Sequence, residues 1–409
     1  MGTENRKNHD GNCIISPGAR ELAREAATSR TNGTDSPPGS PEVPFIPVTV
    51  DENDVVEGAR QILEAIRPHW NMSDVEFKLF TDGITNKLVG CFHSVKEENC
   101  GTSLADNKIT EASNHERDCE DWSRNVVLVR VYGNKTDLLI DRKAETKNFK
   151  VLHNYGFAPS LFAIFNNGLA YEYVPGKTLT VETIIKPEVW ILIAQRMGEM
   201  HKVETGQKKE PMLWNKMQKF LNLVPDQFSD PNKHNRIEKM FLPVSKLKEE
   251  FRNLFNRLEQ LNSPVVFSHN DLLLGNVIYT KSKNRVTFID YEYADYNYQA
   301  FDIGNHFTEF AGIDEIDYTL YPSKEFQNEW LTVYLKAYHK RNQVDKNDIE
   351  KLYVQVNQFA LSSHFFWAVW GLIQAEHSTI DFDFIKFAQT RYSEYLAKKD
   401  TFLALEYEE

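Results

Sequence analysis

The hydrophobic positions of this chain alternate in short runs in its first half and recur at helical spacing in its second half. Residues 55–66 predict an amphipathic helix, because their apolar positions fall on one face. Alternating apolar runs over 77–93 and 161–174 predict two hairpins, and the run 126–132 predicts a buried central strand between them. These elements together predict an N-terminal antiparallel sheet that follows the first helix.

The second half of the chain predicts helices, with one exception. Apolar residues recur with a period near 3.6 over 187–203, 212–228, 242–261 and 349–376. The exception is the stretch 266–310, where two strand-like apolar runs flank polar residues. The predicted fold class is therefore α+β, with an N-terminal antiparallel sheet lobe and a mainly helical C-terminal lobe.

Two polar stretches are predicted to lie outside the packed lobes. Residues 1–44 are rich in Gly, Ser, Thr, Asn and Pro and show hardly any apolar periodicity, which is typical of a disordered tail. Residues 94–125 contain eight acidic and four basic side chains and interrupt the hairpin pattern, which predicts a flexible insertion. The Pro-Gly break at 175–176 is expected to be a hinge, so the lobes are predicted at 45–174 and 175–409.

Composition narrows the class of protein. With 409 residues and 41% hydrophobic content, the chain can bury a large core. A net charge of -12 argues against a nucleic-acid partner, which needs a basic face. The longest apolar stretch, 365–373, is too short for an integral membrane segment, and the N-terminus lacks the features of a signal sequence. A cytoplasmic enzyme is therefore expected.

The cysteines do not predict a disulfide framework or a metal centre. Four are present, at Cys13, Cys91, Cys100 and Cys119. Three of them lie near His93 and His115, as in a zinc site, but the spacing matches no C-x-x-C pair, so unrelated reduced thiols are the preferred interpretation.

The stretch 266–310 carries the candidate chemistry. Asp271 is followed five residues later by Asn276, and Asp290 ends the apolar run VTFID. In phosphoryl transfer, a D-x-x-x-x-N loop offers a carboxylate to accept the proton of the substrate hydroxyl and an amide to hold Mg²⁺, while a later aspartate holds metal against the phosphates. Each piece alone is also typical of tight turns. Their combination predicts an ATP-dependent kinase with Mg²⁺ bound by Asn276 and Asp290 and with Asp271 as the base.

The same stretch resembles the choline/ethanolamine kinase family. The resemblance is carried by His269-Asn270-Asp271, by 289–293 (IDYEY), by 296–298 (YNY) and by 301–306 (FDIGNH). It covers roughly residues 55–400 and implies a two-lobed protein-kinase-like fold, similar to protein kinases and aminoglycoside phosphotransferases, with the site between the lobes. Asp302 and His306 are expected to be scaffold residues, with the Asp302 carboxylate bracing the catalytic loop by hydrogen bonds. His201 is interpreted as a capping or packing residue.

The resemblance implies nucleotide-binding roles that the residues alone leave open. The turn of the first hairpin carries Gly83, Thr85 and Asn86. These residues alone favour an ordinary hairpin, and the resemblance implies that the turn lies over the phosphates. Backbone groups around Glu172 and Val174 would bind adenine.

Arg130 is the only charge in its apolar strand, and a buried cation needs a partner. Glu145 on the following helix is the natural one. The pair is either a structural ion pair or, as the resemblance favours, the equivalent of the kinase Lys–Glu pair, with Arg130 reaching the ATP phosphates.

The acceptor is predicted from the C-terminal lobe. Trp367 and Trp370 lie on one helix face, which usually indicates core, but the resemblance implies that they surround the substrate amine. Glu309 begins an acidic segment reaching Asp317, where choline kinases are rich in aromatic residues. A primary ammonium donates hydrogen bonds to carboxylates, whereas a quaternary ammonium is recognised by aromatic faces. Ethanolamine is therefore the preferred prediction for the substrate, and choline or dual specificity is the alternative.

The resemblance therefore implies phosphorylation of ethanolamine to phosphoethanolamine, the first step of the CDP-ethanolamine route to phosphatidylethanolamine. A homodimer is left open. A catalytically inactive kinase-like binding module is disfavoured because Asp271, Asn276 and Asp290 are all present, and an aminoglycoside-type phosphotransferase is disfavoured by the segment 296–306.

Overall fold

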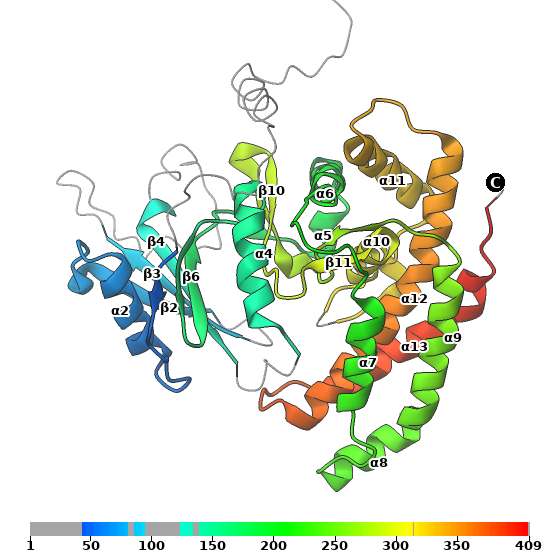
Figure 1. Ribbon diagram of the computed structural model, residues 1–409, viewed down its shortest axis with the longest axis horizontal. Coiled ribbons are helices and arrows are strands. Elements are labelled where there is room, and N and C mark those ends of the chain that lie inside the picture. The colour runs from blue at the N-terminus through cyan, green and yellow to red at the C-terminus, as the bar shows by residue number, and fades with distance from the viewer. Residues whose placement is uncertain (1–42, 81–85, 95–122, 134–138, 314, 408–409) are drawn as a thin grey trace, which may run out of the picture. The chain divides into compact units, whose positions relative to one another are not determined.

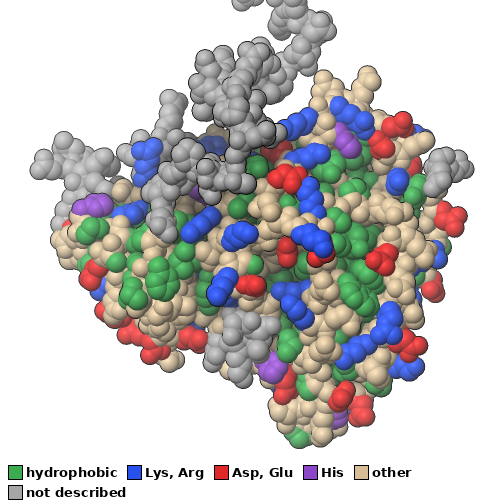
Figure 2. Space-filling view, viewed as in Figure 1, with side chains coloured by type: hydrophobic (Ala, Val, Ile, Leu, Met, Phe, Trp, Pro, Cys, Tyr) green, Lys and Arg blue, Asp and Glu red, His purple; other side chains and the backbone are tan. Residues whose placement is uncertain are grey.

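The computed structural model describes residues 43–80, 86–94, 123–133, 139–313 and 315–407, all within the compact unit Val43–Glu409. The predicted tail and most of the predicted insertion lie outside these residues. Among the described residues, no helix is long and apolar enough to cross a membrane. Figure 2 shows basic and acidic side chains interspersed over one face of the described part of the chain.

A six-stranded sheet forms the N-terminal lobe, with strand order β1-β5-β6-β4-β3-β2 (Figure 1). Its strands are β1 (Phe45–Ile46), β2 (Val75–Phe80), β3 (Asn86–His93), β4 (Val126–Tyr132), β5 (Leu161–Phe165) and β6 (Gly168–Glu172). Neighbouring strands are antiparallel except β1, which pairs parallel with β5 and was not predicted. As predicted, β4 is central, and all its residues except Tyr132 are buried.

Two helices pack against this sheet and frame its approach to the second lobe. Helix α2 (Val55–Ile66) confirms the predicted amphipathic helix and buries Val55, Ala59, Ile62 and Leu63 in the N-terminal core. Helix α4 (Arg142–Asn154) starts at Asp141, whose side chain accepts from the next backbone N–H groups. It lies between the sheet and the helical lobe (Figure 1).

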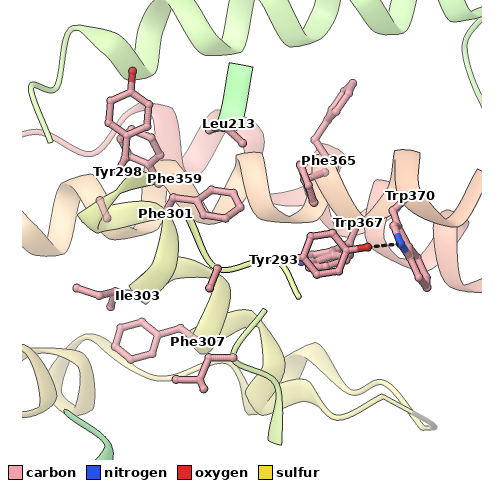
Figure 3. Close-up of a cluster of buried hydrophobic side chains, with 14 of the residues drawn as sticks. Leu213, Tyr293, Tyr298, Phe301, Ile303, Phe307, Phe359, Phe365, Trp367 and Trp370 are labelled. Atoms are coloured by element: carbon pink, nitrogen blue, oxygen red, sulfur yellow. Dashed lines mark hydrogen bonds between the residues drawn. The ribbon is translucent and has the colours of Figure 1, made fainter. Parts of the chain in front are cut away.

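The C-terminal lobe is mainly helical. Its helices are α5 (Val181–Ile184), α6 (Pro187–Met200), α7 (Leu213–Leu223), α8 (Pro231–Met240), α9 (Val244–Glu259), α10 (Gln299–Thr308), α11 (Lys324–His339), α12 (Lys346–His377) and α13 (Phe384–Leu403). Helix α12 is buried continuously from Val354 to Ala375 and packs against α10, α11 and α13. Figure 3 shows Phe301 and Phe307 of α10 among the aromatic side chains that fill this core.

Two small sheets carry the segment that contains the candidate chemistry. Strand β9 (Val277–Thr280) pairs with β10 (Arg285–Phe288) and with β7 (Lys177–Thr178), and β8 (Val265–Ser268) pairs with β11 (Asp295–Tyr298). Asp271 follows β8 and Asp290 follows β10. The antiparallel pairing of β9 with β10 brings the end of β10 back to the loop that contains Asn276, so the predicted carboxylates and amide meet. The predicted boundary between the lobes at 174 stays a prediction.

Candidate active site

The loop after β8 is held by a buried aspartate from α10. Asp302 accepts from the backbone N–H groups of His269, at 2.9 Å, and Asn270, at 2.6 Å. Asn270 adopts a left-handed conformation (φ 66°), and its amide donates to the carbonyl of Tyr293 at 3.0 Å. The predicted bracing role of Asp302 is confirmed, and these contacts fix the backbone from which Asp271 projects.

Asp271 and Asn276 face each other across this loop. The Asn276 side-chain amide donates to the Asp271 carbonyl at 2.9 Å and lies 3.5 Å from its carboxylate. Burial raises the pKa of Asp271 well above its ordinary value, and the negative charges of Asp290, Glu309 and Glu292 add to the effect. Acidic groups from two other segments, 290–292 and the end of α10, therefore surround this carboxylate, as expected where cations are to be bound.

Asp290 is held on a strained backbone and paired with Arg130. Its φ is 61°, in the left-handed region that costs most residues energy. Its carboxylate accepts from Arg130 at 2.5 Å, and Arg130 also donates to Glu145. Burial alone would lower the pKa of Arg130, but the charge of Asp290 and other groups raises it. Arg130 thus stays charged at the junction of the lobes.

The donor set fits a metal that substrate phosphates help to bind. Among the described residues, no group of three or more His, Cys, Asp or Glu could hold a metal ion by itself. Asn276 and Asp290 supply hard oxygen donors of the kind that suits Mg²⁺, which usually keeps waters and takes phosphate oxygens in nucleotide sites. Cys91, the described cysteine, is buried, and burial raises the pKa of its thiol to about 12. The other cysteines lie outside the described residues.

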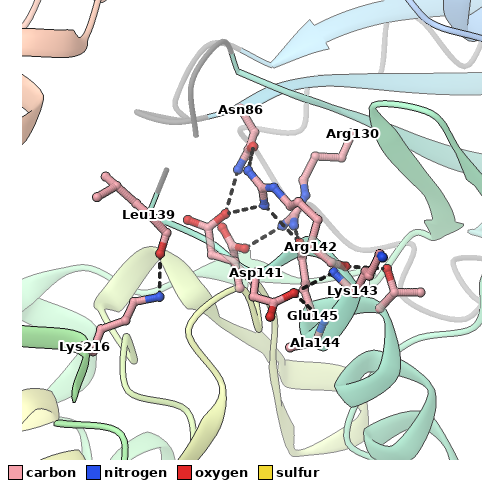
Figure 4. A network of polar contacts seen from close by, with 12 residues as sticks. Asn86, Arg130, Leu139, Asp141, Arg142, Lys143, Ala144, Glu145 and Lys216 are labelled. Atoms are coloured by element: carbon pink, nitrogen blue, oxygen red, sulfur yellow. Dashed lines mark hydrogen bonds and ion pairs between the residues drawn. The ribbon is translucent and has the colours of Figure 1, made fainter. Parts of the chain in front are cut away.

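A second arginine and a second glutamate belong to this network and were missed by the sequence analysis (Figure 4). Arg142 contacts Glu145 at 2.9 Å and Glu292 at 3.3 Å, and its guanidinium lies 3.8 Å from the centre of the Tyr132 ring. Asn86 donates to Glu292 at 3.1 Å. Two signals were available: the position of Arg142 three residues before Glu145, and that of Glu292 two residues after a predicted metal ligand.

Of the other predicted nucleotide-binding residues, the structure describes only some. Gly83 and Thr85 lie outside the described residues. The backbone N–H of Glu172 donates to the carbonyl of Ser160 at 2.9 Å, so it is already used within the lobe. Val174 follows β6 at the predicted hinge. The contacts of Glu172 and Val174 with adenine stay predictions.

The two predicted tryptophans lie next to the catalytic loop. Trp370 donates to the Tyr293 hydroxyl at 2.9 Å, and Trp367 donates to Asn305 at 2.7 Å. The ring of Tyr293 meets Trp367 edge-on at 5.3 Å between centroids (Figure 3). Asp271 and Tyr293 influence each other electrostatically, so this aromatic wall lies close to the candidate base.

Glu309 is not a free carboxylate. One of its oxygens accepts from Arg391 of α13 at 2.6 Å, and both side chains are buried. Beside this pair, the Tyr318 hydroxyl and the Nδ1 atom of His364 are buried without a hydrogen-bond partner among the described residues. Arg391, Tyr318 and His364 were not among the predicted site residues. Orphaned buried polar atoms of this kind indicate a place for water or a ligand.

His201 is more than a packing residue. Its ring bonds the Asp302 carboxylate at 2.9 Å and the Tyr334 hydroxyl at 2.6 Å. Burial by itself would raise the pKa of Asp302, but the hydrogen bond and charge of His201 and the N–H of His269 lower it overall. The ionised Asp302 therefore stabilises the fold above the pKa of an unfolded aspartate, and this contribution is lost as pH falls through the folded value.

Asp302→Asn should reduce the free energy of unfolding at pH 7 by about 3 kcal/mol, because it breaks a buried charged network by removing one partner. The difference between the two proteins should shrink as pH falls below about 4. Urea unfolding at pH 7 and at a pH below about 4 measures the difference in the free energy of unfolding, with the exposed Asp226→Asn as control. An equal difference at both values would contradict the ionised assignment.

The fold and the site together define a phosphotransferase with protein-kinase-like architecture. Among solved structures, an ethanolamine kinase of Plasmodium vivax is similar with a TM-score of 0.69 and 27% identity, covering 84% of this chain and 89% of that one. A choline kinase from Cryptosporidium parvum Iowa II has a TM-score of 0.64 and 24% identity, covering 86% and 98%. The predicted fold class is confirmed.

The sequence comparisons define the family. The model of the Choline/ethanolamine kinase family matches residues 77–396. The chain is 53% identical to an ethanolamine kinase of Drosophila melanogaster, covering 89% of this chain and 81% of that one, and 45% identical to ethanolamine kinase 1 of Homo sapiens, covering 90% and 78%. The chain belongs to the choline/ethanolamine kinase family, as the resemblance predicted.

Proposed function

We propose that this protein transfers the γ-phosphoryl group of ATP to the hydroxyl of ethanolamine, giving phosphoethanolamine and ADP. The observation that carries the proposal is the convergence of Asp271, Asn276 and Asp290 beside an aromatic wall. The relatives with the highest identities reported above are ethanolamine kinases. Phosphoethanolamine would then enter the CDP-ethanolamine route to phosphatidylethanolamine.

In the reaction, a bond forms between the substrate oxygen and the γ-phosphorus, and the bond from that phosphorus to the β-γ bridging oxygen breaks. Asp271 would accept the hydroxyl proton and orient the oxygen in line with the phosphorus. Asn276 and Asp290 would hold Mg²⁺, which would neutralise charge on the phosphates. Arg130 would then exchange Asp290 for phosphate oxygens while Glu145 keeps it aimed.

The remaining nucleotide contacts belong to the same proposal. The turn with Gly83, Thr85 and Asn86 would cover the phosphates, and backbone groups of Glu172 and Val174 would bind adenine. Asn86 supports this assignment because its amide already bonds Glu292, two residues from Asp290. The Asn86 side chain, at the start of β3, therefore reaches the predicted metal-binding segment from the sheet lobe.

The acceptor pocket would be formed by Glu309, Trp367 and Trp370. The Glu309 oxygen that is not bonded to Arg391 would accept from the ethanolammonium group, and the two indoles would cover its carbon stem. Each added methyl group removes a donor and leaves the carboxylate less well paired. The pocket therefore favours ethanolamine over its methylated forms.

We expect kcat/KM to fall from ethanolamine through the mono- and dimethylated amines to choline, by about 10- to 100-fold overall. An ADP-release assay with ATP, Mg²⁺ and the four amines in parallel measures this. Glu309→Gln should cost ethanolamine more than choline, whereas Trp367→Ala should harm both. Equal or better kcat/KM with choline would favour a choline or dual-specificity kinase, and no turnover of any amine would favour an inactive binding module.

Two wider predictions accompany this function. A cytoplasmic location suits an enzyme whose substrates are small and water-soluble, and fractionation of cells with an antibody against the chain would test it. A homodimer remains a prediction, to be measured by light scattering of the purified protein.

A further inference from the structure

A partly buried lysine, Lys216, connects the two lobes next to Tyr293. Lys216 lies on α7 of the helical lobe, and its ammonium donates to the carbonyl of Leu139 at 2.5 Å (Figure 4). Leu139 lies two residues before Asp141, the N-cap residue of α4. Lys216 therefore ties the helical lobe to the start of the helix that carries Arg142 and Glu145.

The same lysine also touches the acceptor wall. Its ammonium lies 5.4 Å from the centre of the Tyr293 ring, within the range of a cation–π contact, and 5.6 Å from that of Phe220. Tyr293 is the residue whose hydroxyl accepts from Trp370 and whose carbonyl accepts from Asn270 of the catalytic loop. One ammonium thus contacts both the wall of the acceptor pocket and the entry to the phosphate-binding network.

The charged state of this lysine is costly for the fold. Among the described residues, its ammonium has a single hydrogen-bond acceptor, which is a neutral carbonyl. Burial lowers its pKa to about 8, the charge of Lys219 on the same helix adds to the effect, and the acids Asp295, Glu292 and Asp141 only partly oppose it. Because the folded pKa lies below that of an unfolded lysine, the charge costs stability below about pH 8. This cost fades as pH rises toward the ordinary lysine value. A methionine at position 216 would fill the same space without this cost in stability.

We propose that Lys216, in its protonated form, is a positioning residue that sets the separation between the ATP-phosphate network and the ethanolamine pocket. It touches neither the phosphoryl group nor the metal. Instead it aligns the donor held by the sheet lobe with the acceptor held by the helical lobe, and in-line transfer is sensitive to such alignment. The inference rests on the proposed function.

The test compares Lys216→Met and Lys216→Arg with the unmodified enzyme and with Lys239→Met, an exposed lysine of α8, as matched control. We expect Lys216→Met to lower kcat by about tenfold or more at pH 7, because misplacement by about 1 Å can cost up to 100-fold. Its melting temperature should stay equal or rise, which a merely structural lysine would not allow. Lys239→Met should change neither quantity.

The pH profile gives a second readout that does not depend on the methionine variant. In the unmodified enzyme kcat should decline as pH rises past 8, and in Lys216→Arg this decline should move to higher pH because a guanidinium stays charged. All variants share the same substrate, so its own titration cancels in the comparison.

The outcomes separate the two proposals. If the unmodified enzyme does not phosphorylate ethanolamine, the proposed function falls together with this inference. If it does, but Lys216→Met keeps kcat and pH profile within twofold of it, only the role of Lys216 is overturned. Loss of folding in Lys216→Met together with an unshifted profile in Lys216→Arg would overturn it as well.

Discussion

Asp271→Asn is expected to lower kcat by about three orders of magnitude, because general base catalysis contributes a factor of about 10² to 10⁴ and the amide cannot accept the proton. The amide keeps the size of the side chain and its place beside Asn276. Nucleotide affinity should therefore stay close to that of the unmodified enzyme. Single-turnover kinetics with ethanolamine and a separate titration of ATP separate these two effects.

The exposed Asp226→Asn serves as the matched control, since it makes the same chemical change far from any predicted role. Turnover of Asp271→Asn within about tenfold of the control would remove Asp271 as the base. A large loss of ATP binding in the same variant would instead place this carboxylate in the nucleotide site.

Asp290→Asn should produce a different defect, in which metal dependence and ATP binding weaken together. The substitution removes the charge expected to hold Mg²⁺ and also the partner that lies 2.5 Å from Arg130. We expect kcat/KM for ATP to fall by about 100-fold or more at physiological Mg²⁺, with partial recovery as Mg²⁺ is raised. Mg²⁺ titrations of the initial rate and calorimetric titration of the nucleotide measure both effects.

Glu145→Gln distinguishes the metal effect from the loss of an arginine partner, because it also removes a carboxylate from Arg130 but none from the predicted metal site. That variant should weaken ATP binding without changing the concentration of Mg²⁺ needed for half-maximal rate. An unchanged Mg²⁺ titration in Asp290→Asn would contradict its assignment as a metal ligand.

Local sequence patterns were sufficient to predict the strands β2 to β6 of the sheet lobe and the catalytic loop. The burial of β4 follows from a run of apolar residues, and the meeting of Asp271 with Asn276 follows from a spacing of five along one loop. Each of these two signals is contained within a few consecutive residues. The β1 strand was missed because two residues give no period.

The contacts that were not predicted join residues far apart in the chain. Arg391 and Glu309 are separated by 82 residues, and Arg142 and Glu292 by 150. No local pattern specifies such pairs, because each depends on how two helices or lobes pack. For the same reason no partner was predicted for Glu309, and His201 was not expected to bond Asp302, 101 residues away.

The continuous burial of α12 has a consequence for synthesis on the ribosome. The catalytic loop depends on Asp302 of α10, α10 packs on α12, and α12 packs on α13, which emerges after every other described helix. The sheet lobe contains all its strands by Glu172 and can fold while translation continues, as N-terminal units generally do. The catalytic centre cannot assemble until α13 has been made. A premature stop codon shortly before Phe384 should therefore yield a protein with a folded first lobe, an exposed aromatic core and no activity. Such a product should be bound by chaperones or degraded by proteases, and it should not behave as a weakened enzyme.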